Sequence, residues 1–146
     1  MTQLSESFTA NSKSKPERNA VPLQTEEELH WVKEMVILPV ILDVLEKDIH
    51  ALQPLPLKMP ELYIQVLRRA QDQASRDLSR LRRELGKRGV KIYDQRRTTQ
   101  GIEASYVCRG YHYRFSMLWG LVKAEVAQRL SVYLGLDAAP AGALRP

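Results

Sequence analysis

The sequence has one cysteine, three histidines and no long apolar run. A lone cysteine, Cys108, excludes an intramolecular disulfide and a multi-cysteine zinc site, and it fits a reducing compartment. The histidines have no metal-ligand spacing, so we expect no metal and no cofactor. The longest apolar stretch, residues 35–42, is less than half of what a membrane-spanning helix needs. These absences predict a protein that does not enter a membrane.

Both ends of the chain are poor in large apolar side chains. Residues 1–24 are rich in Ser, Thr, Asn and Lys, with no apolar segment after the charges, so we expect no signal peptide and a cytoplasmic protein. We expect residues 1–24 to be a disordered polar tail and residues 136–146 to be a flexible C-terminal tail. Residues 25–135 are then predicted to form a single domain.

Charge is distributed unevenly, although the net charge of the 146 residues is only +5. Residues 25–60 carry seven acidic and three basic side chains, and residues 61–116 carry six acidic and thirteen basic ones. A basic segment after an acidic one is typical of a nucleic-acid surface with an acidic flank. The alternative is that the two segments pack together or that each only keeps its own surface soluble.

Two helices are predicted first. Thr25 and Glu28 form a capping-box pattern, and apolar residues then recur at helical spacing to about Leu52. Pro39 lies inside this pattern and predicts a kink or a break near Leu38. After a proline-rich connector, residues 61–87 have a narrow apolar stripe typical of a long helix. The stripe comprises Tyr63, Val66, Leu67, Ala70, Ala74, Leu78, Leu81 and Leu85.

A β-hairpin and a third helix are predicted next. Residues 90–97 and 102–113 alternate as strands do, with a turn at residues 98–101 between them. A last helix over residues 117–134 would be capped by Ser116. Its Glu125 and Arg129 form either an ordinary surface ion pair, which we prefer, or a partly buried pair that fixes helix register. The fold class is therefore α+β and predominantly helical, in the order helix, helix, two-stranded antiparallel hairpin, helix.

Five basic side chains of the long helix share one side of it. At about 100° per residue they lie in a sector about 60° wide, opposite the apolar stripe. This set, here called the basic face, is Arg69, Arg76, Arg80, Arg83 and Lys87. Phosphates favour such a row because each guanidinium can bind bidentately. We predict non-specific contact with nucleic-acid phosphates, assisted by Arg96 and Arg97, in a non-enzymatic binding or regulatory protein. A solvated surface partly neutralised by Asp72, Asp77 and Glu84 is the other interpretation.

Two further hypotheses remain open. The apolar stripe of the long helix could be shared between two subunits, which would make the chain a self-associating interaction or structural module. An enzyme would need a site among the aromatic residues around Tyr111 and His112. Cys108 with His112 lacks an orienting residue and an oxyanion hole, so we predict no catalytic residue. Aromatic side chains packed on the last helix explain this strand more simply.

Three stretches carry a resemblance to a known group of proteins. They are VILPVILDVLEKDI from Val36, LRRELGKRGVKIY over residues 81–93, and RGYHY over residues 109–113. The sequence resembles small uncharacterised proteins of spore-forming Bacilli and their mobile elements over about residues 30–134. The resemblance implies a bacterial cytoplasmic setting with a regulatory, sporulation or phage-related role. It implies no particular activity and no functional residue.

Overall fold

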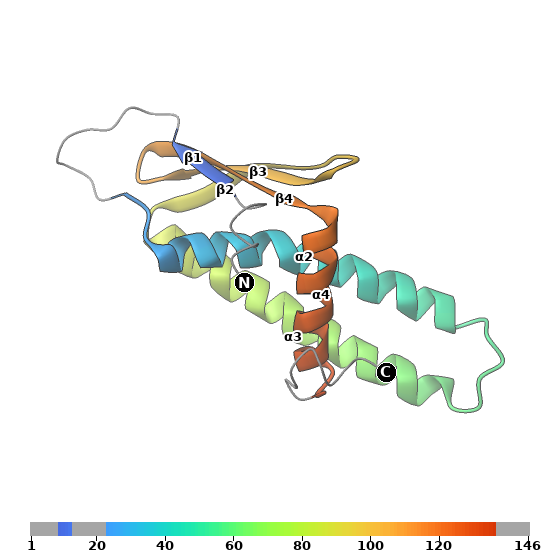
Figure 1. Cartoon of the computed structure of the whole chain (residues 1–146). Helices are drawn as coiled ribbons and strands as arrows, with labels where there is room; N and C mark the ends of the chain where they lie inside the picture. Colours follow the sequence, from blue (N-terminus) through green and yellow to red (C-terminus); the bar gives the residue numbers. More distant parts are fainter. Residues whose placement is uncertain (1–8, 13–22, 137–146) are drawn as a thin grey trace.

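The computed structural model describes residues 9–12 and 23–136 (Figure 1). In chain order its elements are β1 (Thr9–Ser12), α2 (Glu26–Leu52), α3 (Pro60–Lys87), β2 (Val90–Arg97), β3 (Gly101–Cys108), β4 (Tyr111–Leu118) and α4 (Trp119–Tyr133). The predicted class, α+β and rich in helix, is confirmed, as is the order of two helices, β structure and a last helix. No helix within the described residues is long and apolar enough to cross a membrane.

Helix α2 begins at the predicted capping box. The backbone N–H of Glu28 donates to the Thr25 hydroxyl at 3.0 Å, and the Glu28 carboxylate accepts the Thr25 N–H at 3.0 Å. Of the kink or break predicted near Leu38, the break is wrong, because α2 continues through Pro39 to Leu52. Ile37 and Ile41 on either side are completely buried. Their burial and that of their neighbours outweighs the roughly 3 kcal/mol that an internal proline costs a helix.

Helix α3 forms an antiparallel hairpin with α2 (Figure 1). It begins with Pro60, whose missing N–H is harmless in the first turn, and it extends to Lys87 as predicted. Ala70 and Ala74 are buried, and such small side chains let the two helix backbones approach closely. Leu81 and Leu85 continue the buried side of α3 toward its C-terminal end.

The predicted two-stranded hairpin is a three-stranded antiparallel meander. The second strand expected over residues 102–113 is wrong, because a two-residue turn at Arg109 and Gly110 divides it into β3 and β4. Arg109 has φ 48° and Gly110 has φ 93°. Two consecutive positive φ angles match the twist of the flanking strands. Cys108 and Tyr111 pair directly across the turn.

Strand β1 adds a fourth strand to the free edge of β4, giving the order β1-β4-β3-β2. The disorder predicted for residues 1–24 is therefore wrong at Thr9–Ser12, where the edge of β4 supplies hydrogen-bond partners. Residues 1–8 and 13–22 of that tail lie outside the described residues. So does the predicted C-terminal tail, apart from Leu136.

The last helix starts later than predicted. Ser116 does not cap it, because β4 continues to Leu118 and α4 begins at Trp119. Met117 pairs with Ile102 across the sheet and is buried, so this segment gains more as a strand than as a helical turn. The Trp119 N–H donates to the Gln100 carbonyl at 3.0 Å, and its indole N–H donates to the Thr98 carbonyl at 2.8 Å.

One face of the sheet packs on α2, and α3 follows the other side of α2 (Figure 1). Helix α4 crosses both helices, in front of them in this view. The core contains Tyr106 and Phe115 from the sheet, together with the buried side of α2. Tyr106 stacks on Tyr113 with ring centroids 5.5 Å apart, and its hydroxyl donates to Gln24 at 2.6 Å. This arrangement leaves the outer side of α3 facing away from the sheet.

Candidate functional site

The basic face lies on the outer side of α3. All five of its side chains are exposed, as predicted, while Ala70, Ala74, Leu81 and Leu85 are buried on the other side of the helix. From Arg69 to Lys87 the row is about 27 Å long, at 1.5 Å per residue. Because the buried side is packed on α2, the row is presented on a helix that cannot rotate about its axis.

Only part of the basic face is neutralised within the chain. Arg80 contacts Asp77 at 3.0 Å, and Lys87 contacts Glu84 at 3.4 Å. Arg76 donates to the neutral amide of Gln73 at 2.9 Å. Within the described part of the chain, no carboxylate lies in ion-pair distance of Arg69, Arg76 or Arg83. Three of the five cations can therefore take an external anion without losing an internal carboxylate partner.

Asp77 connects the basic face to α4. The Tyr133 hydroxyl donates to its carboxylate at 2.6 Å, and Gln73 and Arg80 donate to its other oxygen. Burial alone would raise the pKa of the Asp77 carboxyl group, but together these hydrogen bonds lower it by more. The pKa of Asp77 is therefore below its ordinary value. A shallow groove of about 540 Å³ lies beside this contact. Its lining is Arg69, Asp72, Gln73, Arg76, Asp77, Val132 and Tyr133.

The structure does not bring Arg96 and Arg97 to the basic face. They are neighbours in β2, so their side chains point to opposite sides of the sheet. Arg97 reaches Asp43 of α2 at 2.7 Å, and Arg96 contacts Glu103 of β3 at 2.9 Å. They also lie about 20 Å along β2 from the end of α3. Both arginines therefore have carboxylate partners within the chain, and both are distant from the basic face on α3.

The aromatic strand residues mostly fill the core. Tyr106, Tyr113 and Phe115 are buried. Cys108 points into the core and His112 points outward, so the two do not form a nucleophile and base. Burial raises the pKa of the Cys108 thiol, which is the reverse of what an activated nucleophile needs. Among the residues that the structure describes, no group of three His, Cys, Asp or Glu side chains is placed to hold a metal ion.

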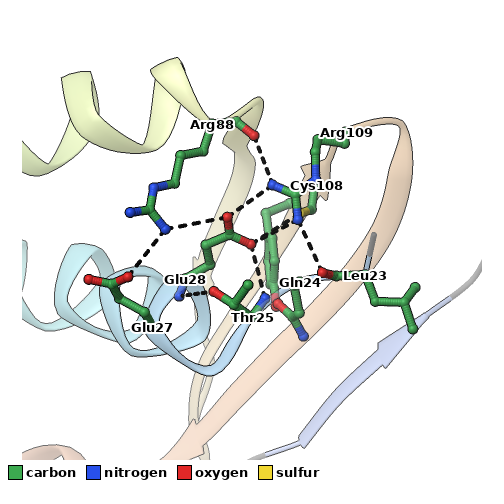
Figure 2. Close-up of polar contacts among 9 residues, drawn as sticks. Leu23, Gln24, Thr25, Glu27, Glu28, Arg88, Cys108 and Arg109 are labelled. Carbon is green, nitrogen blue, oxygen red and sulfur yellow. Dashed lines mark hydrogen bonds and ion pairs between the residues drawn. The ribbon is translucent and has the colours of Figure 1, made fainter. Parts of the chain in front are cut away.

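A buried ionic cluster around Glu28 was not predicted (Figure 2). The Glu28 side chain is only 4% exposed, and both of its oxygens accept from the Arg109 guanidinium, at 2.9 and 3.0 Å. The hydrogen bonds from Arg109 lower the pKa of Glu28 to about 2; burial opposes this, and the Thr25 N–H adds to it. The capping carboxylate of α2 is thus also the counter-ion of a distant arginine.

Two arginines tie this cluster to other segments. Arg109 also donates to the carbonyls of Arg88 and Leu23, at 3.0 and 3.1 Å. Arg88 contacts Glu27 at 3.3 Å, and its guanidinium lies 4.6 Å from the centre of the Trp31 ring. The cluster therefore joins the start of α2, the α3–β2 connection and the β3–β4 turn (Figure 2). Its contacts serve the fold, and no sequence pattern links partners 81 positions apart.

A second ion network joins α2 to α4. Arg129 contacts Glu125 one turn earlier at 3.0 Å, and it contacts Glu34 of α2 through two nitrogens. Lys33 contacts Glu125 at 3.1 Å. The Glu125 and Arg129 side chains are only 11% and 21% exposed. The pair lies within α4, is partly buried and is joined to α2 through Glu34 and Lys33, so the ordinary surface pair preferred from the sequence is wrong.

Residues 23–138 match the family model described as YhjD protein. The chain belongs to the YhjD family. A relative named "Uncharacterized protein YhjD", from Bacillus subtilis (strain 168), is 24% identical over 114 residues, which cover 78% of this chain and 95% of the relative. No solved structure matches the chain. The resemblance to small uncharacterised proteins of Bacilli is confirmed, and the likeness to mobile elements stays a prediction.

The region shared with the YhjD family contains α2 through α4 and so includes both the basic face and the Glu28 cluster. Strand β1 precedes it. The family match thus covers the whole of the candidate site, and neither comparison assigns that site an activity.

The Glu28 cluster makes the stability of this YhjD-family chain depend on acid pH. Glu28 has a pKa of about 2 in the folded chain, lowered from its ordinary 4.5. The stabilisation is therefore complete above about pH 4.5 and is lost as the pH falls toward 2. We expect Glu28 to account for about 2 kcal/mol of the stability lost between pH 7 and pH 3. Urea titrations at pH 7, 5, 4 and 3 should show a shallower acid loss for Glu28→Gln than for the native chain. If the free energy of unfolding fell equally with pH in the native chain and in Glu28→Gln, Glu28 would not be the source of the acid sensitivity.

Proposed function

We propose that this protein is a non-enzymatic binding protein that contacts nucleic-acid phosphates through the basic face of α3. One observation carries the proposal: five exposed cations form a row about 27 Å long, and three of them have no carboxylate partner in the described chain. A duplex carries about one negative charge per 1.7 Å of its axis, so such a row would face several phosphates.

The ion pairs already present do not prevent this contact. Lys87 and its partner Glu84 are 72% and 42% exposed, and such an exposed pair contributes only about 0–1 kcal/mol, so a phosphate can compete for Lys87. Arg80 is 58% exposed, although its partner Asp77 is only 19% exposed, so part of the guanidinium still faces solvent. Binding would need no rearrangement of the helix, because α3 is fixed on α2 by its buried alanines and leucines.

The contact would be largely independent of sequence. Phosphate contacts position a protein on nucleic acid but do not distinguish bases. The basic face is formed of arginines and one lysine along one helix, with no aromatic side chain among them. We therefore propose a protein of the cytoplasm that binds through charge and helical shape, in a regulatory or accessory role.

Fluorescence anisotropy with random-sequence duplex DNA and duplex RNA, at several salt concentrations, tests the proposal. The variant Arg69→Gln/Arg76→Gln/Arg83→Gln removes the three cations that lack a carboxylate partner. We expect salt-sensitive binding by the native chain. The slope of log affinity against log salt should fall by up to about 3 in the variant, since each phosphate contact contributes about 0.9.

A matched control removes the same charge elsewhere. Lys91, Arg114 and Lys123 are exposed and lie outside α3, so Lys91→Gln/Arg114→Gln/Lys123→Gln should bind nearly as the native chain does. Circular dichroism establishes that both variants are folded. Equal losses in the two variants would show that net charge alone attracts nucleic acid, and the basic face would then have no special role. Absence of binding by the native chain at low salt would refute the proposal directly.

A further inference from the structure

A pocket lies where the C-terminal end of α3 meets the start of β2. Its volume is about 510 Å³, within the range of sites that hold small molecules. The apolar part of its lining comes from three elements and consists of Met35, Leu85, Val90 and Ile92. The first three of these side chains are buried and belong to the core. The inner wall of the pocket is therefore an uncovered part of the core surface.

The α3–β2 connection creates this pocket. The Gly89 N–H donates to the Gly86 carbonyl at 3.1 Å, and Gly89 has φ 78°, so the chain passes from helix to strand within two residues. Helix α3 and strand β2 leave the connection in diverging directions (Figure 1). Gly86 lines the space between them, and a Cβ placed on it would have no atom within 4 Å. Glycine is unfavourable inside a helix, and here its missing side chain leaves the pocket open.

Arg82 gives the pocket a positive charge at its rim. Its side chain is exposed, and no carboxylate in the described part of the chain lies in ion-pair distance of it. Gln95 adds a neutral amide. Lys91 also borders the pocket, but the alternation of β2 directs its side chain to the outer face of the sheet. No carboxylate occurs among the described residues that line the pocket.

Acidic side chains occur on the surrounding segments, but each has a partner elsewhere. Glu46, about 16 Å from Met35 along α2, accepts from Gln71 at 2.6 Å. The others form ion pairs: Glu27 with Arg88, Glu28 with Arg109, Asp43 with Arg97, Glu84 with Lys87, and Asp94 with Arg96. The pocket therefore presents a positive charge to a ligand.

The free edge of β2 adds hydrogen-bond donors. The Arg109 N–H donates to the Gly89 carbonyl at 2.8 Å, so these two residues form a bonded pair at the start of the β2–β3 ladder. Bonded and non-bonded pairs alternate in an antiparallel ladder. Val90 and Ile92 therefore direct their N–H and C=O groups away from β3, and β2 is the last strand of the sheet. Both residues line the pocket, so their N–H groups supplement the guanidinium of Arg82.

We propose that this pocket binds a small organic anion, namely a carboxylate with an apolar body. The apolar body would cover Met35, Leu85 and Ile92, and the carboxylate would accept from the guanidinium of Arg82 at the rim. An arginine can hold a carboxylate through two parallel hydrogen bonds, which an alcohol or an amine cannot form. This inference goes beyond the phosphate-binding proposal and does not rest on it.

NMR titration of the ¹⁵N-labelled native chain with octanoate tests the proposal. We expect saturable shifts of the amide signals of residues 82–92 and 95, with a dissociation constant below about 1 mM. Acetate has the same head group without the apolar body, and octylammonium has the same chain with the opposite charge. Each should bind at least about tenfold more weakly than octanoate, because each lacks one of the two contacts.

Two variants locate the site. Gly86→Leu puts a side chain into the pocket and should abolish octanoate binding, and Arg82→Gln should weaken it about tenfold by removing a charge-assisted hydrogen bond. The matched controls are Gly120→Leu, at an exposed helical glycine of α4 with equally open space, and Arg114→Gln. Both controls should bind as the native chain does, and the NMR spectra establish that all four variants are folded.

Three results would overturn the proposal. The first is a native chain without saturable shifts at about 10 mM octanoate, ten times the expected dissociation constant. The second is octylammonium binding as tightly as octanoate, which would mean that the charge of Arg82 selects nothing. The third is unchanged octanoate binding by Gly86→Leu, which would place the ligand outside this pocket.

Discussion

Replacing Arg109 with methionine should lower the free energy of unfolding by about 4 kcal/mol, since breaking a buried ion pair typically costs 3–5. The variant keeps most of the aliphatic stem but leaves Glu28, whose side chain is 4% exposed, without its bidentate partner. Arg88 lies 3.6 Å from the same carboxylate and is too exposed to replace Arg109. The carbonyls of Leu23 and Arg88 would lose a donor as well.

Urea denaturation followed by circular dichroism measures this loss. Arg114→Met is the matched control, because Arg114 is an exposed arginine in the adjacent strand and should change stability by at most about 0.5 kcal/mol. The double variant Glu28→Gln/Arg109→Met should lose less than the sum of the two single variants, because each single change leaves the other group unpaired. Additive losses would mean that the two side chains do not stabilise each other.

Replacing Arg129 with methionine should cost about 3 kcal/mol, by the same mechanism in the second ion network. Glu34 and Glu125 are only 14% and 11% exposed; Glu125 would keep Lys33, whereas Glu34 would keep only His30 at 3.8 Å, whose pKa burial lowers, so that it is a poor counter-ion. Because this network joins α2 to α4, the loss should be accompanied by faster amide exchange in α4 than in α3.

Hydrogen exchange and urea denaturation together check this prediction. Lys123→Met, at an exposed position of the same helix, is the control and should change little. If Arg129→Met lowered stability but left exchange in α4 unchanged, the network would stabilise the chain without holding α4 on the hairpin.

Local patterns predicted the two long helices well. Thr25 with Glu28 specified the start of α2, and the stripe ending near Leu85 specified α3, because both signals lie within a few turns. Pro39 led to a wrong prediction because the local sequence shows only the backbone hydrogen bond that a proline removes. In the folded chain the residues around Pro39 are buried, and this burial keeps the helix intact. Such burial depends on distant partners that a local pattern does not contain.

The β region was harder to predict for related reasons. Tyr113, Phe115 and Met117 are buried at every second position, a strand signal that extends past Ser116, where a helix cap was expected. The turn before it has Arg109 at a positive φ, where glycine or asparagine is usual. Its contacts with Glu28 hold it there. Strand β1 has a polar sequence with no apolar alternation, and its backbone pairing with β4 specifies it.

Some features of the candidate site were predictable from local sequence, and others depended on long-range packing. Exposure of the basic face was predictable, because helical periodicity alone places Arg69 through Lys87 opposite the buried stripe. The ion-pair partners of Arg96 and Arg97 were not predictable, because they depend on which side of the sheet α2 covers. The Glu28 cluster was not predictable either, because long-range packing brings together residues that are 81 positions apart in the sequence.

The Glu28 cluster also bears on how the chain unfolds. Its members come from the first turn of α2, from the α3–β2 connection and from the β3–β4 turn, so the Glu28–Arg109 pair exists only when the helical hairpin and the meander are both in place. A local opening of either part exposes the same carboxylate and loses the same energy. We therefore expect the cluster to couple the helices to the sheet, so that both unfold in a single transition.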